Sequence, residues 1–214
     1  MARPKDQRAR REQIIRATLQ TIADHGIAGL TGKRIAAVAG LSPRLIAYYY
    51  PDQDALVEAA HQAATDRYYW TRQAVVEAEL TPTDKLARLL HSGLPRGKDL
   101  QLSQVLDEIS VNASRSPMHA ALVTLLFERE VSLYTAVLED GAAVGEFELT
   151  DAADVLARNF VALEDALGMH LLANNSAMTL DRAERQLASY ARAVTGVAIE
   201  PAAGSATSQA RHSG

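Results

Sequence analysis

Start and stop signals for helices divide almost the whole chain into amphipathic segments, and this limits the fold more than any other feature. Ile15, Leu19 and Ile22 recur at helical spacing, and Gly26 follows as a left-handed stop. Two later segments begin with a Ser-Pro pair, which joins a capping hydroxyl to a proline suited to the first turn. No run shows the alternation typical of strands, so an all-α fold is predicted. The expected helices span residues 8–25, 32–39, 43–50, 53–79, 84–93, 100–113, 117–139, 151–173 and 180–195.

The length of 214 residues allows one or two domains. We expect a DNA-binding domain over 1–50, a second domain over 51–197 and a small, polar, disordered tail over 198–214. The chain has no cysteine, which excludes disulfides and thiolate metal sites. It has no apolar run long enough for a membrane span, and its start lacks the apolar core of a signal peptide. A cytoplasmic protein with no membrane contact is expected.

Charge is distributed unevenly along the chain. The net charge is −4, yet residues 1–50 carry nine Lys or Arg residues against three acids. The other 164 residues therefore hold ten more acids than bases. A small region can carry spare charge by chance, but this division favours a basic head that meets a polyanion and an acidic body that does not.

The stretch 30–51, LTGKRIAAVAGLSPRLIAYYYP, has the pattern of a helix-turn-helix. Such a motif needs a small residue at the helix crossing, a turn residue tolerant of positive φ and an apolar residue under the turn. Ala36, Gly40 and Leu41 fill these positions. The apolar seam is expected at Ile35, Val38 and Ile46.

Polar groups around this motif suit contacts to phosphates and bases. Thr31 and Ser42 place hydroxyls at helix N-termini, and Arg44 has the donor geometry to read a guanine edge. Alternatively, Gly40 only ends a helix and the three tyrosines 48–50 are ordinary packing. The combination with a basic N-terminal arm favours DNA binding.

With these residues, LTGKRIAAVAGLSPRLIAYYYPDQDALVEA resembles the DNA-binding head of the TetR (tetracycline repressor) family of bacterial transcriptional regulators. The shared pattern covers about residues 10–60: Thr, then I-A-x-x-A-G-(V/L)-S, an aromatic cluster, a short break and x-x-x-L. The resemblance implies a homodimer of nine-helix, two-domain subunits with a C-terminal domain that binds a small effector. The DNA contacts that it implies fall on Thr31, Lys33, Ser42, Pro43, Arg44, Leu45, Tyr48 and Tyr49.

The sequence departs from the family pattern at three positions. Ala47 replaces a common aromatic, and Tyr49 stands where a histidine or tyrosine is usual before the last aromatic. Gln53 replaces a lysine that often holds phosphate, which puts one phosphate contact per subunit in doubt and softens the expected salt dependence. Arg8, Arg10 and Arg11 can supply positive charge instead.

Residues 140–172 resemble the effector domains of regulators related to the betaine-pathway repressor, through GEFE and ALEDALGMHLL. An apolar cavity with a few inward polar groups is expected between the fourth and eighth helices. Carboxylates within apolar stripes suit a cationic or amine-bearing effector, although salt bridges to Arg129 or Arg158, or exposure at a subunit edge, explain them equally well. The aromatic candidates can likewise be plain core packing. The candidate ligand residues are Tyr69, Trp70, Glu108, Asn112, Phe127, Glu130, Phe160 and Glu164.

The helices at 151–173 and 180–195 carry broad apolar stripes. The family resemblance implies that such helices form a four-helix homodimer interface, and the alternative is that both stripes are buried within one subunit. The six histidines lack zinc-site spacing and no G-x-S-x-G occurs, so neither an enzyme nor a cofactor is expected. The resulting hypothesis is a repressor released from a palindromic double-stranded DNA operator by a small-molecule effector. The alternative is a helical protein-binding adaptor that has lost DNA binding.

Overall fold

The computed structural model describes residues 4–199 and confirms the all-α fold: this part of the chain holds nine α-helices, two short 3-10 helices and no strand. The predicted tail lies outside the described residues from position 200 onward, while Ile199 is buried against the core. The α-helices are α1 Pro4–His25, α2 Gly32–Ala39, α3 Pro43–Tyr49, α4 Gln53–Val76, α5 Pro82–Ser92, α6 Leu100–Asn112, α7 Pro117–Ala143, α8 Ala153–Leu172 and α9 Leu180–Thr195. The 3-10 helices are η1 Gly97–Asp99 and η2 Ala113–Arg115.

Capping side chains set most of the helix starts. The hydroxyls of Ser42, Thr81 and Ser116 each accept a backbone hydrogen bond in the first turn of α3, α5 and α7, and proline occupies the first helical position each time. The expected start of α8 at residue 151 is wrong, because α8 begins at Ala153 without a side-chain cap. Asp151 instead accepts a hydrogen bond from the adjacent amide of Ala152.

Two helices are four residues longer than expected: α1 begins at Pro4 and not at residue 8, and α7 continues to Ala143 beyond its expected end at 139. The ring of Phe147 folds back onto Gly141, where a Cβ atom would lie only 2.1 Å from the ring. The helix therefore passes through a glycine that leaves room for the following loop to pack.

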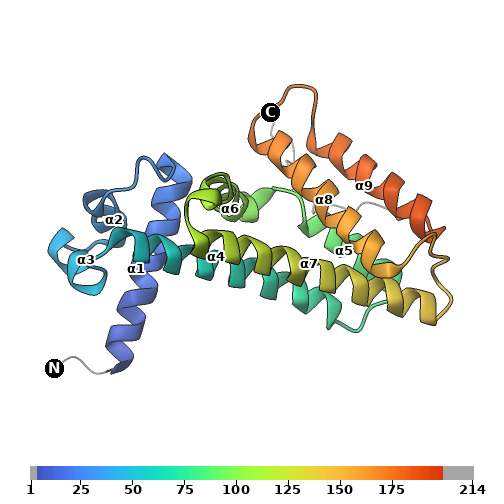
Figure 1. Ribbon diagram of the computed structural model, residues 1–214, viewed down its shortest axis with the longest axis horizontal. Coiled ribbons are helices and arrows are strands. Elements are labelled where there is room, and N and C mark those ends of the chain that lie inside the picture. Colours follow the sequence, from blue (N-terminus) through green and yellow to red (C-terminus); the bar gives the residue numbers. More distant parts are fainter. Residues whose placement is uncertain (1–3, 200–214) are drawn as a thin grey trace, which may run out of the picture.

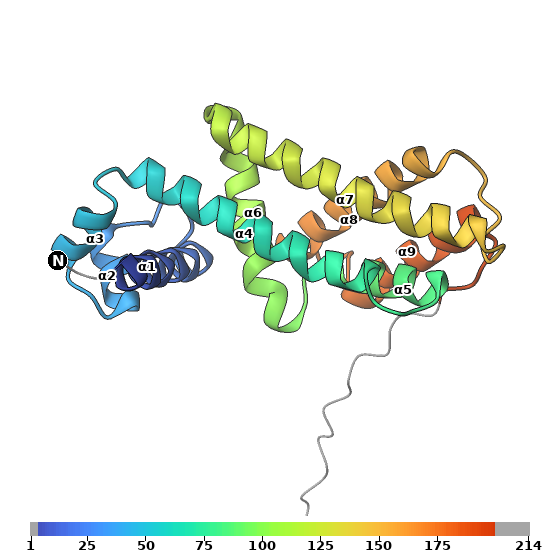
Figure 2. The ribbon, with the colours of Figure 1, turned by 90° about the horizontal axis from the view of Figure 1, so that it is seen from below.

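The helices form an elongated molecule with α1, α2 and α3 at one end (Figure 1). From this head, α4 runs into the body and lies alongside α7, while α8 and α9 are at the far end (Figure 1). Figure 2 shows α6 beside α4 at the boundary between the head and the body. Thus α4 belongs to both parts and joins them directly.

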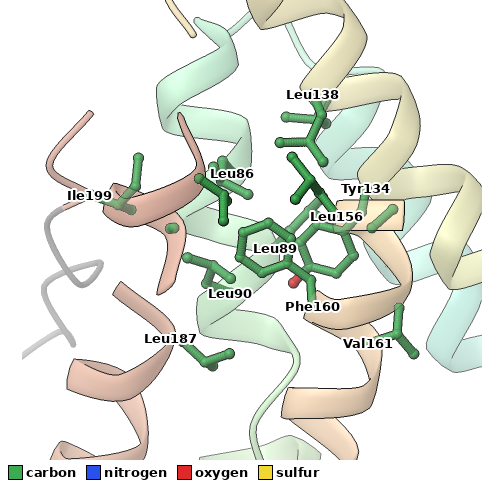
Figure 3. Packing of buried hydrophobic residues seen from close by; sticks show 14 of the residues in the cluster. Leu86, Leu89, Leu90, Tyr134, Leu138, Leu156, Phe160, Val161, Leu187 and Ile199 are labelled. Atoms are coloured by element: carbon green, nitrogen blue, oxygen red, sulfur yellow. The ribbon is translucent and has the colours of Figure 1, made fainter. Parts of the chain in front are cut away.

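Two hydrophobic cores correspond to the head and the body. The head core combines residues of α1 to α3 with apolar side chains of α4 and α6. The body core is formed by α5, α7, α8 and α9 (Figure 3). At its centre Tyr134 and Phe160 stack with their ring centroids 5.0 Å apart.

The apolar stripes of α8 and α9 are buried within this subunit, so they do not form the exposed surface that the sequence suggested. Six of these side chains are buried and three are partly buried against the same core. The buried ones are Phe160, Leu167, Ala183, Leu187, Ala191 and Val194; the partly buried ones are Leu163, Leu171 and Leu180. These stripes are therefore not available for contact with a second subunit.

Within residues 4–199, no helix has both the length and the apolar character needed to cross a membrane.

Candidate DNA-binding surface and effector cavity

The turn between α2 and α3 has the local geometry that the sequence predicts. Gly40 adopts a left-handed conformation with φ 65°, which a residue with a side chain rarely adopts. The amide of Leu41 then donates to the carbonyl of Ala36 at 2.9 Å, and Ala36 is buried at the crossing. Val38 is 48% exposed, so its assignment to the apolar seam is wrong: it lies on the outward face of α2.

Six of the eight expected DNA contacts are exposed to solvent. These are Thr31, Lys33, Ser42, Pro43, Arg44 and Tyr48. Leu45 and Tyr49 are half-buried. The exposed residues lie on α2 and α3 or at their starts, so one surface presents cations, hydroxyls and an aromatic ring.

The tyrosines at the end of α3 divide into one exposed and two packed side chains. Tyr48 is 72% exposed, whereas Tyr49 and Tyr50 pack against the head core. The guanidinium of Arg11 lies 5.9 Å from the ring centroid of Tyr49 and 5.3 Å from that of Tyr50. Arg11 thus holds α1 against the end of α3 by cation–π contacts.

Two glutamine side chains hold the head together, a role that was not predicted from the sequence. Gln13 donates to the carbonyl of Ala39 at 2.7 Å, which fixes α1 to the end of α2. Gln53, at the position of the expected phosphate-binding lysine, donates to the carbonyl of Leu30 at 3.4 Å. Its amide therefore braces the start of α4 against the loop before α2.

A cavity of about 550 Å³ opens between α4, α6, α7 and α8, a volume suited to a small molecule. Its lining contains four carboxylate residues and, among the described residues, neither lysine nor arginine. The acidic residues are Asp107, Glu130, Glu164 and Asp165. Of the expected ligand residues, Phe127, Glu130 and Glu164 line this cavity.

The other expected ligand residues do not line the cavity. Trp70 is 60% exposed, and its ring packs edge-on against Tyr69, which in turn faces Arg129. Glu108 accepts a hydrogen bond from the amide of Ile27 at 3.0 Å, so it joins α6 to the head. Phe160 is a core residue stacked on Tyr134. The side chain of Asn112 lies outside the described part of the chain.

A buried guanidinium lies behind the acidic wall of the cavity. Arg72 on α4 is 1% exposed, and its Nη2 lies 3.0 Å from Oε2 of Glu164 on α8. Its Nε lies 3.7 Å from Oε1 of Glu130 on α7, which is an ion pair without a hydrogen bond. Nη1 donates to the carbonyl of Leu89 and to the hydroxyl of Ser92 on α5. One side chain therefore links α4 to three other helices.

Glu164 is held more tightly than Glu130. Tyr134 donates a short hydrogen bond to Oε1 of Glu164, while Arg72 binds the other oxygen. The carboxylate also lies directly against Gly93, where a Cβ atom would be 1.8 Å from Oε1. Glycine at the end of α5 is thus required for the close approach of this carboxylate.

Burial shifts the acid–base equilibria of both glutamates. It raises the pKa of Glu130 to about 8, and Arg72 opposes this shift. It raises the pKa of Glu164 to about 7, against the opposing effects of Arg72 and of the Tyr134 hydrogen bond. The cavity therefore presents carboxyl groups that an added positive charge can stabilise in their ionised form.

A pair of histidines joins α4 to the start of α7. Nδ1 of His61 lies 3.0 Å from Nδ1 of His119, so one ring donates to the other. His61 is 1% exposed and lines the cavity. Burial and the neighbouring His119 lower the pKa of His61 to about 4, which favours the neutral imidazole. No group of three or more potential metal ligands occurs in the described residues.

Arg72 and His61 were missed at the level of sequence, although a signal was present. Together with Thr65 and Tyr68 they recur at spacings of three and four, which places polar groups along the buried face of α4. A polar row on an otherwise buried face indicates internal partners. The identity of those partners depends on helices far away in the sequence.

Comparison with known proteins gives the family. Residues 14–60 match the family model described as bacterial regulatory proteins, tetR family. Over 51 residues the chain is 53% identical to the HTH-type transcriptional regulator BetI of Stenotrophomonas maltophilia, a match that covers 24% of this chain and 26% of that protein. The first BetI relatives are thus matched over about a quarter of their length.

Solved structures extend the similarity over the body. A TetR transcription regulator from Haloarcula marismortui aligns with a TM-score of 0.77 and 25% identity, covering 87% of this chain and 98% of that one. A putative transcriptional regulator from Saccharomonospora viridis in complex with choline aligns with a TM-score of 0.78 and 21% identity, covering 85% and 95%. The second similarity concerns the fold.

The helix-turn-helix head on a helical body defines a DNA-binding transcriptional regulator, and the chain belongs to the TetR family. Within that family it is related to the regulators named BetI. Its relatives are regulators of transcription and not enzymes.

Proposed function

We propose that the protein is a homodimeric repressor that binds a palindromic operator and is released by a small cationic effector. The observation that carries the effector class is the cavity wall, which holds four acidic residues and, among the described residues, neither lysine nor arginine. The regulator from Saccharomonospora viridis, which has the same fold, was solved in complex with choline. Choline carries a permanent positive charge and is a suitable first probe.

On the DNA side, the proposal assigns α3 to the major groove. Arg44 contacts base edges there, while Thr31, Lys33 and Ser42 bind phosphates on either side. Tyr48 contacts the backbone at the end of the helix. The remaining expected contacts, Pro43, Leu45 and Tyr49, shape the surface between them.

The dimer is assigned to the outward face of α8. Three residues on this face recur at spacings of four and three and are exposed in the subunit: Val155, Asn159 and Ala162. Small side chains allow a second helix to approach closely, and a two-fold axis through this face completes a bundle with α9. Two heads must reach half-sites one DNA turn, about 34–36 Å, apart.

Release follows from the position of α4. This helix begins at Gln53, shortly after α3 ends at Tyr49, and near its own end it carries Arg72, which is buried beside the cavity. An effector that binds more tightly to the released arrangement shifts α4 and changes the spacing of the heads. A ligand with equal affinity for both arrangements has no effect on DNA binding.

A footprint on the DNA that flanks the gene tests the function. The folded protein is expected to protect two half-sites with two-fold symmetry, and choline is expected to remove the protection. A folded dimer that retards no DNA at low salt would contradict the regulator and favour the protein-binding adaptor.

The dimer is tested separately by light scattering. Ala162→Arg, in the middle of the α8 face, is expected to give a monomer that has lost cooperative operator binding. Ala9→Arg, on the exposed side of α1, is the matched control and should remain a dimer. A dimer that persists in Ala162→Arg would place the interface elsewhere.

A further inference from the structure

The two buried glutamates of the cavity differ in what already binds them, and this difference assigns them separate roles. Glu164 has a hydrogen bond from Arg72 at 3.0 Å, a second from Tyr134 and a wall at Gly93. Its charge is compensated and its carboxylate has no space to move. Glu130 has a hydrogen bond from the neutral Tyr68 hydroxyl, but it lies 3.7 Å from the Nε atom of Arg72, and that Nε atom forms no hydrogen bond.

The charge balance of the cluster points in the same direction. Arg72 supplies one positive charge to two buried carboxyl groups, and its two terminal nitrogens hydrogen-bond to the carbonyl of Leu89 on α5 and to Glu164. A second carboxylate in this buried site needs its own cation or must hold a proton. Glu130 also lines the cavity, so a ligand can reach its carboxyl group.

We propose that Glu130 is the counter-ion of the effector: a single positive charge enters the cavity and replaces the proton that Glu130 carries when the cavity is empty. Arg72 and Glu164 are then a structural pair whose charges neutralise each other, which leaves Glu130 as the buried carboxyl group that binds the cation. This inference rests on the proposed function, because it takes the cavity to be the effector site. Beyond the proposed function, the inference specifies that the effector carries one positive charge, that Glu130 selects it and that Glu130 loses a proton when the effector binds.

Charged and polar groups on the helices packed around Glu130 change how readily its carboxyl group ionises. Arg72 favours the ionised carboxylate and Tyr68 donates a hydrogen bond to it, whereas the carboxyl groups of α8 disfavour ionisation. The facing groups are Arg72 and Tyr68 on α4, and Glu164 and Asp165 on α8. His61 on α4 and Asp107 on α6 line the same cavity.

Burial outweighs these contacts, and the pKa of Glu130 is raised to about 8. At neutral pH the empty site therefore holds the proton, and binding of a cation must release it. The proton is transferred to the buffer, so no other reactant is required. Cation binding is expected to become tighter as the pH rises toward 8.

The experiment compares choline with 3,3-dimethyl-1-butanol, which has the same shape and no charge. Calorimetry at pH 7 in two buffers with different ionisation enthalpies measures both the affinity and the protons released. For the wild-type protein we expect choline to bind at least tenfold more tightly than the neutral analogue. Its binding should release between half a proton and one proton per subunit, and binding of the neutral analogue none.

Glu130→Gln keeps the size of the side chain and removes its charge. It should weaken choline binding at least tenfold, abolish the proton release and leave the affinity for the neutral analogue within about twofold. Asp165→Asn, which removes another carboxylate of the same wall, is the matched control and should retain most of the preference for choline. Circular dichroism verifies that both variants are folded.

Two results would overturn the inference. One is a Glu130→Gln variant that keeps both the preference for choline and the proton release, and the other is a folded wild-type protein that binds no choline. Operator binding by the ligand-free protein is a separate measurement that does not depend on either result. If the folded wild-type protein binds no operator, the proposed regulator is rejected. If it binds the operator but gives either of the two results above, only the role of Glu130 is rejected.

Discussion

The carboxylate of Glu164 lies against the backbone of Gly93, so close that the smallest side chain at position 93 would overlap it. This contact joins the end of α5 to α8 and positions the acceptor for Arg72. Because Gly93 has no Cβ atom, Glu164 on α8 can form its buried ion pair with Arg72 on α4, although the two helices are far apart in the sequence. Stability of the body depends on this contact.

Gly93→Ala is expected to destabilise the protein by about 1–3 kcal/mol, because the new Cβ atom forces Glu164 away from Arg72 and Tyr134. Urea unfolding followed by circular dichroism measures the change. Gly32→Ala is the matched control, since nothing lies within 4 Å of the added Cβ in α2. It should be neutral or slightly stabilising. Equal stability of the two variants would contradict the close contact.

Glu130→Gln is expected to change how stability depends on pH. The pKa of Glu130 is raised from 4.5 to about 8 in the folded state, so between these values the folded protein holds more protons than the unfolded chain. Its contribution is complete below pH 4.5 and is lost as the pH rises through 8. Glutamine cannot ionise, so the variant should lose less stability than the wild type between pH 5.5 and 8. Urea midpoints at both pH values test this, and parallel decreases would contradict it.

His61 is expected to act in the opposite direction. Its pKa is lowered from 6.5 to about 4, so between these values the unfolded chain binds more protons and stability falls as the pH falls. The loss can reach about 1.4 kcal/mol per pH unit. His61→Asn keeps a polar partner for His119 and should show a smaller loss between pH 6.5 and 4.5. The control is His25→Asn at the exposed end of α1, which should follow the wild type. A His61→Asn profile identical to the wild-type one would rule out this contribution.

Arg44→Ala is expected to relax base preference at the operator and to cost about 1–3 kcal/mol of binding free energy. The reason is the loss of a bidentate contact to one base edge. Lys33→Ala, which removes a phosphate contact, should weaken all operator variants equally and reduce the salt slope by about 1. Binding titrations over operators with single base changes separate the two effects. An Arg44→Ala variant with unchanged preference at every base pair would exclude base reading by this residue.

The sequence was sufficient for the features that depend on neighbouring residues. Gly40 marked the turn because only a left-handed residue ends α2 there, and Ser42 marked the start of α3 through its own hydrogen bond to Leu45. The all-α fold follows from many such local signals. Val38 was assigned to the wrong face of α2, because a helix of only two turns has too few apolar residues to define its buried face from their spacing.

The cavity could be predicted only in part. Glu130 and Glu164 were candidates because a carboxyl group in an apolar stripe requires a ligand or a partner, and Phe127 was a candidate as an aromatic side chain; all three line the cavity. The partners considered for the two carboxyl groups were Arg129 and Arg158, which instead pair with Asp66 and Glu128. Arg72 is separated from Glu164 by 92 residues, and no local pattern encodes such a distance.

The head core includes Leu102, Val105 and Ile109 of α6, and Glu108 of the same helix accepts the hydrogen bond of Ile27. A fragment that ends after α3 would expose this apolar surface to water. The packing surface of α6 is therefore part of the head, and chimaeras that exchange sensors should keep α6 with the head from which it comes.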